Sequence, residues 1–382
     1  MVVLFLYFSL FLAVHFLAKR FNSTETARQF EIVCCFLLLF VFFGFRDITV
    51  LNDSPHYYGF YYHKAHSIAY QNDSIFTFRL LDKFEYGFQV LVHFLIKYVS
   101  KDPYTIIILS SLVISIGELW FISKHCKDIA KMCFFMLISS LLFTHYCIIR
   151  QALAILIFYV AFNYFQKGKM WKYVLLILCA GLFHYSAYFL LLLPLICKNK
   201  PTWRNAIIAI GVAVVLAAFT FELLSILGLR DHPYYKAAVQ KNAISIVGIA
   251  DCALLSIIIG VIAYAHRISR KTQIDAFYFW ICTTAMCVSI VSLVIYPIAR
   301  VNEYLWTLIL FMLFKYIDPQ AMKEPFSPSF TGTHRLLRIF IVLVFAVKMI
   351  GINAFRPEWQ HYTPYKFYRF DQERHNFNIY RL

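Results

Sequence analysis

Charged residues are scarce in this chain of 382 residues. Only 15% of its residues are Asp, Glu, Lys or Arg, against about 25% in an ordinary soluble domain. Hydrophobic residues make up 61% of the chain, and the mean hydropathy is +0.66. The stretch 276–296 holds no charged residue at all. Runs of roughly 18 or more mostly apolar residues are typical of membrane spans, so this composition argues against a soluble protein.

Several other patterns are missing as well. Strict period-2 alternation is absent, which argues against a transmembrane barrel and leaves helices as the spanning element. The ten cysteines show no Cys-x-x-Cys or Cys/His spacing, and most lie in or beside apolar runs, so neither a metal site nor a disulfide is implied. The apolar stretch 1–18 lacks a basic n-region and a clear cleavage site, which favours a retained first span over a signal peptide.

The sequence therefore predicts an all-α polytopic transmembrane bundle that forms one integral membrane domain over 1–382, with about 11–13 membrane segments. The segments 173–184 and 185–197 are either one bent crossing or two half-helices. We expect spans at 2–18, 30–45, 87–100, 104–122, 132–147, 149–166, 173–184, 185–197, 205–228, 247–265, 276–296, 302–317 and 336–353.

The net charge of +16 is spread among the spans rather than striped on one face, which does not favour a nucleic-acid partner. Positive-inside bias places the connectors around Arg28 and 167–172 in the cytoplasm. The segment 46–86 is then an extracytoplasmic loop, as are 228–243 and the region of Arg300. The aromatic and basic tail 354–382 could pack at the headgroups.

One connector conflicts with this topology. Lys124, Lys127 and Lys131 have a cytoplasmic character, yet two full spans after Glu85 would place them outside. The segment 87–100 carries His93 and is thin for a span. The alternative is an interfacial or re-entrant segment that does not cross the membrane.

Ionisable residues near lipid depth are costly, and this makes them candidates for function. Arg46 and Asp47 open the outer loop, followed by Asp53 and Tyr57. The plain structural explanation is a loop-start ion pair with Tyr anchors at the interface. Glu85 stands where the loop re-enters the membrane. It could instead be a helix N-terminal acid that favours the positive end of the helix dipole.

Two further candidates lie between apolar runs. Arg150, followed by Gln151, carries a planar guanidinium that matches a carboxylate or a phosphate. The alternative is an arginine that snorkels to the interface. His184, followed by Tyr185, could act as a base because its pKa lies near physiological pH, or could be a core histidine with satisfied hydrogen bonds.

A last candidate precedes a late span, where Pro297 ends the previous one. Arg300 is followed by Asn302, Glu303 and Tyr304. Glu303 could simply neutralise Arg300, or the arginine could contact phosphate. Taken jointly, the candidates comprise arginines, a histidine and acids assigned to one membrane face. A polyprenyl diphosphate carries adjacent negative charges at that depth, and arginines could stabilise its departure.

The order of these motifs resembles the EpsG-like branch of the Wzy polysaccharide polymerases over about residues 40–370. The early acidic motif departs from the family pattern, because Asp53 precedes Tyr57 with a proline between them, so the matching acid is either Asp47 or Asp53. The motifs that carry the resemblance are Arg46-Asp47 before a Tyr-rich loop, 84–88 (Phe-Glu-Tyr-Gly-Phe), 149–154 (Ile-Arg-Gln-Ala-Leu-Ala), 167–169 (Lys-Gly-Lys), 180–187 (Ala-Gly-Leu-Phe-His-Tyr-Ser-Ala), 299–304 (Ala-Arg-Val-Asn-Glu-Tyr) and 362–368 (Tyr-Thr-Pro-Tyr-Lys-Phe-Tyr).

The resemblance implies a fold similar to the membrane-embedded GT-C-type glycosyltransferases. It also implies a multi-pass protein of the bacterial cytoplasmic membrane that extends O-antigen, capsule or exopolysaccharide on the outer face. Donor and acceptor would be undecaprenyl-diphosphate-linked oligosaccharides, with no nucleotide sugar at this step. The partners are then these lipids and the bilayer, with a chain-length regulator left open. No cofactor is expected, and no metal, since no Asp-x-Asp cluster lies on the outer side.

Under this hypothesis Arg150 and Arg300 hold the diphosphate, and His184 or Glu85 takes the acceptor proton. The sequence leaves a lipid-linked oligosaccharide flippase, a glycan ligase, an acyltransferase and a scaffold as alternatives. A flippase is expected to have charged residues that line a path at mid-membrane depth, whereas the candidates here cluster toward one face. Many transporters also contain internal inverted repeats, which are not evident in this sequence. The residues expected to bind substrate are Arg46, Asp47, Asp53, Tyr57, Gln151, Tyr185, Asn302, Glu303 and Tyr304.

Overall fold

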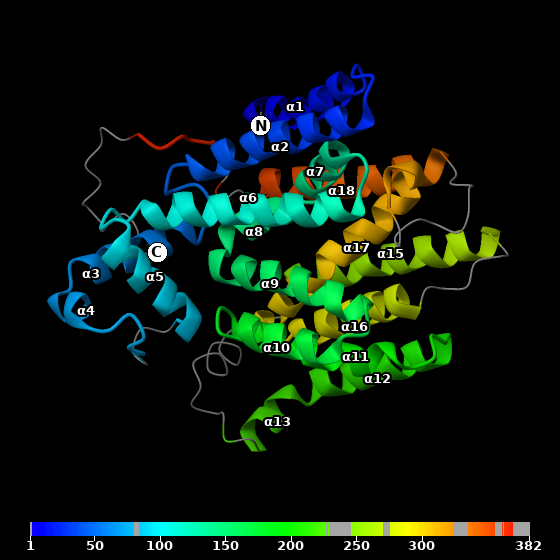
Figure 1. The fold of residues 1–382 in the computed structure, drawn as a ribbon. Helices are drawn as coiled ribbons and strands as arrows, with labels where there is room; N and C mark the ends of the chain where they lie inside the picture. Colours follow the sequence, from blue (N-terminus) through cyan, green and yellow to red (C-terminus); the bar gives the residue numbers. More distant parts are fainter. Residues whose placement is uncertain are drawn as a thin grey trace. The chain divides into compact units, whose positions relative to one another are not determined.

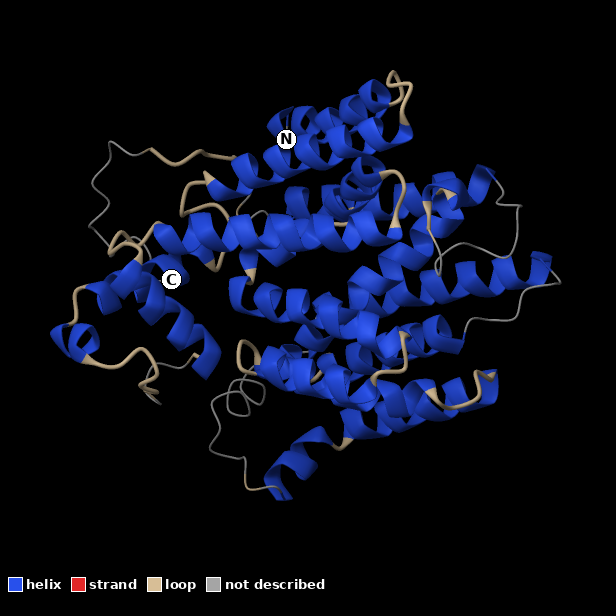
Figure 2. Cartoon of the chain, in the orientation of Figure 1, coloured by secondary structure: helices blue, strands red, loops and turns tan. Residues whose placement is uncertain are grey.

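The structure, a computed structural model, describes residues 2–79, 84–226, 228, 246–269, 276–323, 335–355, 361 and 363–369. These residues are helices joined by loops (Figure 2), with two isolated β-bridges besides. They fall into two compact units. The first comprises the described residues of 1–185, 320–327 and 339–382, and the second those of 186–319 and 328–338. The all-α prediction is confirmed, whereas the single membrane domain stays a prediction.

The first unit contains the longest run of consecutive helices (Figure 1). Within it, α2 packs against α6, α1 against α7 and α9 against α10. Its helices are α1 (Val2–Ala18), α2 (Thr24–Gly44), α3 (Ser54–Ala65), α4 (Ile68–Asn72), α5 (Tyr86–Tyr98), α6 (Thr105–His125), α7 (Ile129–Ile138), α8 (Leu141–Cys147), α9 (Ile149–Gln166), α10 (Met170–Gly181) and most of α18 (Arg335–Phe355).

The second unit is organised around α16, which packs against α12, α15 and α17. The expected pair 173–184 and 185–197 proves to be α10 followed by a 3-10 helix and a short α-helix. The helices of this unit are η2 (Tyr185–Leu192), α11 (Leu193–Cys197), α12 (Trp203–Ala218), α13 (Thr220–Ile226), α15 (Ile246–Ser269), α16 (Ala276–Ser292), η3 (Tyr296–Val301) and α17 (Asn302–Ile317), and η4 (Pro319–Ala321) lies at the boundary.

Side-chain caps fix where two of the long helices begin. The hydroxyl of Ser23 accepts a hydrogen bond from the backbone amide of Thr26 at 3.3 Å and caps α2. The hydroxyl of Thr202 does the same for the amide of Asn205 at 3.2 Å and caps α12. Each cap satisfies one of the amides that the first turn of a helix leaves without an intrahelical partner. Polar residues before apolar runs therefore set these helix starts.

Helices α2 and α6 run antiparallel, and their ends are tied together. At one end the hydroxyl of Tyr104 donates to the carbonyl of Arg46 at 2.7 Å. At the other end the carbonyl of Ser123 accepts from Arg28 at 2.9 Å and from Lys323 at 2.9 Å. The end of α6 therefore lies with the start of α2, and the chain between Arg46 and Tyr104 makes no net crossing.

Helix α5 is consequently not a span. It has 13 residues, and a helix of that length rises only about 20 Å, against roughly 30 Å for a hydrocarbon core. The expected span at 87–100 is corrected in favour of the interfacial or re-entrant alternative. This correction also removes the conflict at Lys124, because the end of α6 shares an end of the bundle with Arg28.

Two expected spans are broken in the structure. The segment predicted as one span at 132–147 forms α7 and α8, which meet at an angle of 76°. Ser140 takes a left-handed conformation there, with φ of 66°. The segment expected at 205–228 forms α12 and α13, bent by 67°. Neither break lies at a Pro or a Gly, which explains why the sequence pattern did not reveal them.

Three described helices are long and apolar enough to cross a membrane, at 24–44, 105–125 and 297–315, and the number is up to five if each bent pair is one span. The expected 11–13 segments also included shorter apolar helices such as α1 and α10. The predicted outer region 228–243 lies outside the described residues apart from Gly228. Of the tail 354–382, the structure describes 354–355, 361 and 363–369.

A short C-terminal segment, 363–369, lies against the start of the loop after α2. The amide of Asp47 donates to the carbonyl of Lys366 at 2.8 Å, and the amide of Tyr368 donates to the carbonyl of Phe45 at 2.8 Å. The ring of Tyr368 stacks on Tyr104, with centroids 3.7 Å apart. Residues from opposite ends of the sequence thus fix the segment where the predicted outer loop begins.

Candidate active site

Arg150 and Glu85 form a buried ion pair in the first unit. Arg150 lies in the first turn of α9, and its Nη1 contacts Oε2 of Glu85, the residue just before α5. The side chains are only 16% and 6% exposed. The guanidinium also lies over the ring of Phe84, 4.4 Å from its centroid. Leaving one member of such a buried pair alone costs about 3–5 kcal/mol, so each residue holds the other in place.

Tyr57 of α3 is the third member of this group. Its hydroxyl oxygen accepts a hydrogen bond from the backbone amide of Arg150 at 3.5 Å. Burial raises the pKa of Tyr57 to about 12, although nearby Arg150 acts in the opposite direction. The phenol therefore keeps its proton at neutral pH. Its ring stands 5.6 Å from Phe88 and 6.2 Å from Phe84, so aromatic side chains surround the ion pair.

The chain before His184 meets the start of α5 directly. The amide of Gly87 donates to the carbonyl of Leu182 at 2.8 Å. A Cβ on Gly87 would lie 2.9 Å from that oxygen, so only glycine allows this approach. Phe183 packs against the hydrophobic cluster that contains Tyr57. His184 follows and is itself buried. The motifs 84–88, 149–154 and 180–187 thus meet around one cluster.

Arg46 and Asp47 are buried, and their polar atoms bond to the protein. Arg46 donates to Ser111 Oγ at 3.0 Å, to the Tyr146 carbonyl at 3.0 Å, to Ser54 Oγ at 3.2 Å and to the carbonyl of Phe43. This arginine thus joins the end of α2 to α3, α6 and α8. A role for Arg46 in binding substrate stays a prediction.

The acids at the loop start have local backbone roles. Asp47 Oδ1 accepts from the amide of Thr49 at 2.9 Å and from its hydroxyl at 2.7 Å. Asp53 is the N-cap residue of α3, and its carbonyl accepts from the amide of Tyr57. Gln151 is buried in the first turn of α9. Sugar contacts by Asp47, Asp53 and Gln151 stay predictions.

The remaining candidates belong to the second unit, apart from Tyr185, which ends the first and is 58% exposed. Asn302 Nδ2 donates to the carbonyl of Ala285 at 3.1 Å and to Ser289 Oγ at 2.8 Å, so it joins α17 to α16. The remaining residues are partly buried Arg300 and Glu303, and fully buried Tyr304, whose hydroxyl accepts from Ser186 Oγ at 3.4 Å.

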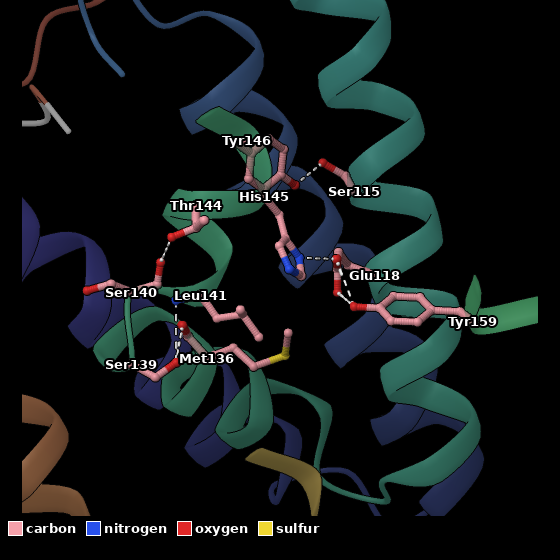
Figure 3. Close-up of polar contacts among 10 residues, drawn as sticks. All are labelled: Ser115, Glu118, Met136, Ser139, Ser140, Leu141, Thr144, His145, Tyr146 and Tyr159. Atoms are coloured by element: carbon pink, nitrogen blue, oxygen red, sulfur yellow. Dashed lines mark hydrogen bonds and ion pairs between the residues drawn. The ribbon is translucent and has the colours of Figure 1, made fainter. Parts of the chain in front are cut away.

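Sequence reasoning missed a second buried polar group in the first unit. Glu118 of α6 contacts both His145 of α8 and Tyr159 of α9 (Figure 3). Glu118 and His145 each stand inside an apolar run that was itself expected to be a span. The rule that intramembrane ionisable residues are candidates for function would have found them, had it been applied along the whole span as well as at its ends.

The described residues thus form a multi-pass helical membrane protein with a buried arginine–carboxylate pair beside an aromatic cluster. Among these residues no group of three or more His, Cys, Asp or Glu side chains could hold a metal ion. The model of the EpsG family matches residues 30–367 of the chain. The chain therefore belongs to the EpsG family, as the motif order indicated. No curated protein and no solved structure matches it.

Proposed function

We propose that this protein is a glycosyltransferase that joins undecaprenyl-diphosphate-linked repeat units into a polysaccharide. The reaction takes place at the outer face of the bacterial cytoplasmic membrane. Membership of the EpsG family supports polysaccharide biosynthesis as the process. The observation that carries the proposal is the buried Arg150–Glu85 pair. It combines a phosphate-binding cation with a carboxylate that can accept a proton.

The donor in this reaction is a growing glycan on its lipid diphosphate. A hydroxyl of the incoming lipid-linked unit attacks the anomeric carbon, and a new glycosidic C–O bond forms. The bond from that carbon to the diphosphate breaks, and the diphosphate leaves with the electron pair. The acceptor hydroxyl loses its proton to a protein base. The product chain stays on the lipid of the incoming unit.

Arg150 holds the departing diphosphate in this mechanism. Its Nη1 is paired with Glu85, whereas its buried Nε has no hydrogen-bond partner among the described residues. The planar fork of a guanidinium suits two phosphate oxygens. When phosphate binds Arg150, it competes with Glu85, and the carboxylate then becomes available to take the acceptor proton. His184 is the alternative base, and Arg300 of the second unit the second phosphate ligand.

Sugar recognition falls to the outer loop in this proposal. Tyr57 offers a protonated hydroxyl next to Arg150, and either Asp47 or Asp53 supplies a carboxylate at the loop start. Aromatic rings such as Phe84 line the same place and can stack on sugar faces. Tyr185 is 58% exposed, whereas Tyr304 is fully buried. Substitutions at these positions should change which repeat unit is used before they abolish polymer.

The test is the length of the glycan on the lipid carrier in cells that carry substituted forms of the gene. Arg150→Ala and Glu85→Ala should each leave single repeat units on the lipid. Arg79→Ala is the matched control, because Arg79 also pairs with an acid, Asp73, but both side chains are about a third exposed. An exposed pair contributes little, so this variant should still make long chains.

The other outcomes identify the alternative activities. Long polymer in the Arg150→Ala variant would overturn the role of that residue. Loss of the gene could instead leave long polymer stranded on the carrier, which defines a ligase. Accumulation of lipid-linked units on the inner face defines a flippase, and the assignments to Arg150 and Glu85 would then lose their basis.

A further inference from the structure

A carboxylate, an imidazole and a phenol meet in the interior of the first unit (Figure 3). His145 Nδ1 lies 2.6 Å from Glu118 Oε1, and the hydroxyl of Tyr159 lies 3.2 and 3.1 Å from the two carboxylate oxygens. The side chains of His145 and Glu118 are 0% and 1% exposed. Each residue comes from a different helix, so the group joins α6, α8 and α9.

Burying such a group inside a membrane protein is energetically costly, and ionisable residues in this setting usually have a function. Glu118 stands in the middle of α6, one of the three described helices that can cross a membrane. An ionisable pair in that position loses its hydration and must recover the loss from its partners. The hydrogen bonds of the group join three helices at one point. Such bonds fix one specific register, whereas helices in contact through apolar side chains alone could shift against one another.

The residues after His145 lead directly to Arg150. Tyr146 bonds through its hydroxyl to Ser115 at 2.6 Å, and its carbonyl accepts from Arg46. Cys147, the last residue of α8, is buried. A single residue, Ile148, is both the C-cap of α8 and the N-cap of α9. We call the group of Glu118, His145 and Tyr159 the anchor, and the connection through Ile148 the α8–α9 joint. Because the joint is a single residue, a displacement of His145 is passed on directly to Arg150.

We propose that Glu118 and His145 are positioning residues that hold the α8–α9 joint and thereby fix Arg150 against Glu85. This inference rests on the role of Arg150 in the proposed function. The pair makes no contact with substrate in this account. Tyr159 strengthens the anchor by binding both oxygens of Glu118, which keeps the carboxylate directed at His145. Displacing a phosphate ligand by about 1 Å can cost on the order of a hundredfold in rate.

Cys147 gives a readout of the joint that does not depend on activity. It is buried, and it lies between His145 and Arg150 in sequence. The full-length protein in native membranes is treated with N-ethylmaleimide, and labelling is quantified cysteine by cysteine from peptide masses. Glu118→Ala and His145→Ala should each raise the labelling rate of Cys147 by about tenfold or more, the change expected from losing a hydrogen bond to a charged group.

Matched controls separate a local effect from general unfolding. Cys282 of the second unit is also buried, at 2% exposed against 6% for Cys147, and should keep its slow labelling in every variant. Glu118→Gln keeps the volume and the hydrogen-bonding oxygen, so it should restore most of the protection of Cys147. Ser110→Ala removes a buried hydroxyl from α6 that donates to the carbonyl of Ile107 in the same helix, and it should change nothing. Unchanged Cys147 labelling, or equal rises at Cys147 and Cys282, would overturn the inference.

A double-mutant cycle then tests whether the anchor acts through Arg150. Arg150→Lys keeps the charge but not the fork, and is expected to retain residual polymerisation. Adding Glu118→Ala to that variant should cause much less additional loss than Glu118→Ala causes alone, because both changes remove the same contact. Fully additive losses would contradict the positioning role. If Cys147 responds but no variant affects polymer length, the anchor stands and the proposed function fails.

Discussion

The amide of Gly87 and the carbonyl of Leu182 form a 2.8 Å hydrogen bond that joins the start of α5 to the segment before His184. Leu182 directly follows α10, and Gly87 lies in the first turn of α5. The bond brings together two motifs that are far apart in the sequence. It also links the two segments that carry Glu85 and His184, the two proposed proton acceptors.

Alanine at position 87 tests this junction. Its Cβ would lie 2.9 Å from the Leu182 oxygen, a backbone atom that cannot rotate away. We expect Gly87→Ala to cost about 1–3 kcal/mol of stability through overpacking and to shorten the polymer strongly. Gly59→Ala, in α3, is the control because no atom lies within 4 Å of its new Cβ, and alanine there favours the helix. Thermal unfolding in detergent and glycan length measure the two effects.

Removing the Arg46 side chain should destabilise the fold, and any loss of polymer should follow from that destabilisation. Its guanidinium is fully buried and donates to four groups of the protein. Each buried acceptor left unsatisfied costs about 1–3 kcal/mol, so Arg46→Ala should lower both abundance in the membrane and thermal stability. Arg79→Ala should lower neither. Normal abundance together with lost polymer would instead support the substrate-binding role that the sequence suggested for Arg46.

Alkaline pH should weaken the fold through Tyr57. Burial raises the pKa of Tyr57 to about 12, above the ordinary value of about 10. The native state then holds this proton more tightly than the unfolded state. The contribution of Tyr57 to the free energy of unfolding is therefore complete below pH 10 and is lost as the pH rises towards 12. Tyr57→Phe lacks the titrating group. The melting temperature of wild type should therefore fall more steeply than that of Tyr57→Phe above pH 10, and parallel curves would contradict the assignment.

The stacking of Tyr368 on Tyr104 gives a prediction about the C-terminal segment. Aromatic pairs contribute about 0.5–1.5 kcal/mol beyond burial, so Tyr368→Ala should lower the melting temperature by several degrees. Tyr368→Phe keeps the ring and should behave as wild type. Phe367→Ala removes a side chain that is 52% exposed and should have a smaller effect. Equal losses in all three variants would show that the backbone bonds, and not the stack, hold this segment.

Much of the helical pattern could be predicted from the sequence. The expected spans at 2–18, 149–166 and 302–317 coincide with α1, α9 and α17. These helices are mostly apolar, and a hydropathy window identifies such segments most readily. The break at Ser140 was not predictable, because a left-handed serine follows from packing around it and not from its own conformational preference.

The candidate site was predicted only as separate residues. Arg150 and Glu85 were each singled out, but nothing in their local sequence indicates that they pair across 65 positions. Substrate binding by Asn302 stays a prediction, and the packed helices add what its sequence position does not indicate, that its amide joins α16 and α17. The family assignment succeeded where single residues could not, since the order of short motifs is specific even when each motif is weak.

The chain between Arg46 and Tyr104 leaves the bundle and returns to it at the same place, closed by the bond from the Tyr104 hydroxyl to the Arg46 carbonyl. Because its two ends lie together, the segment between Arg46 and Tyr104 can be replaced by that of another protein without changing the direction of any later helix. Chimeras that swap it between members of the EpsG family would test whether this segment determines which sugar is used, as the proposed function holds, while the membrane helices stay unchanged.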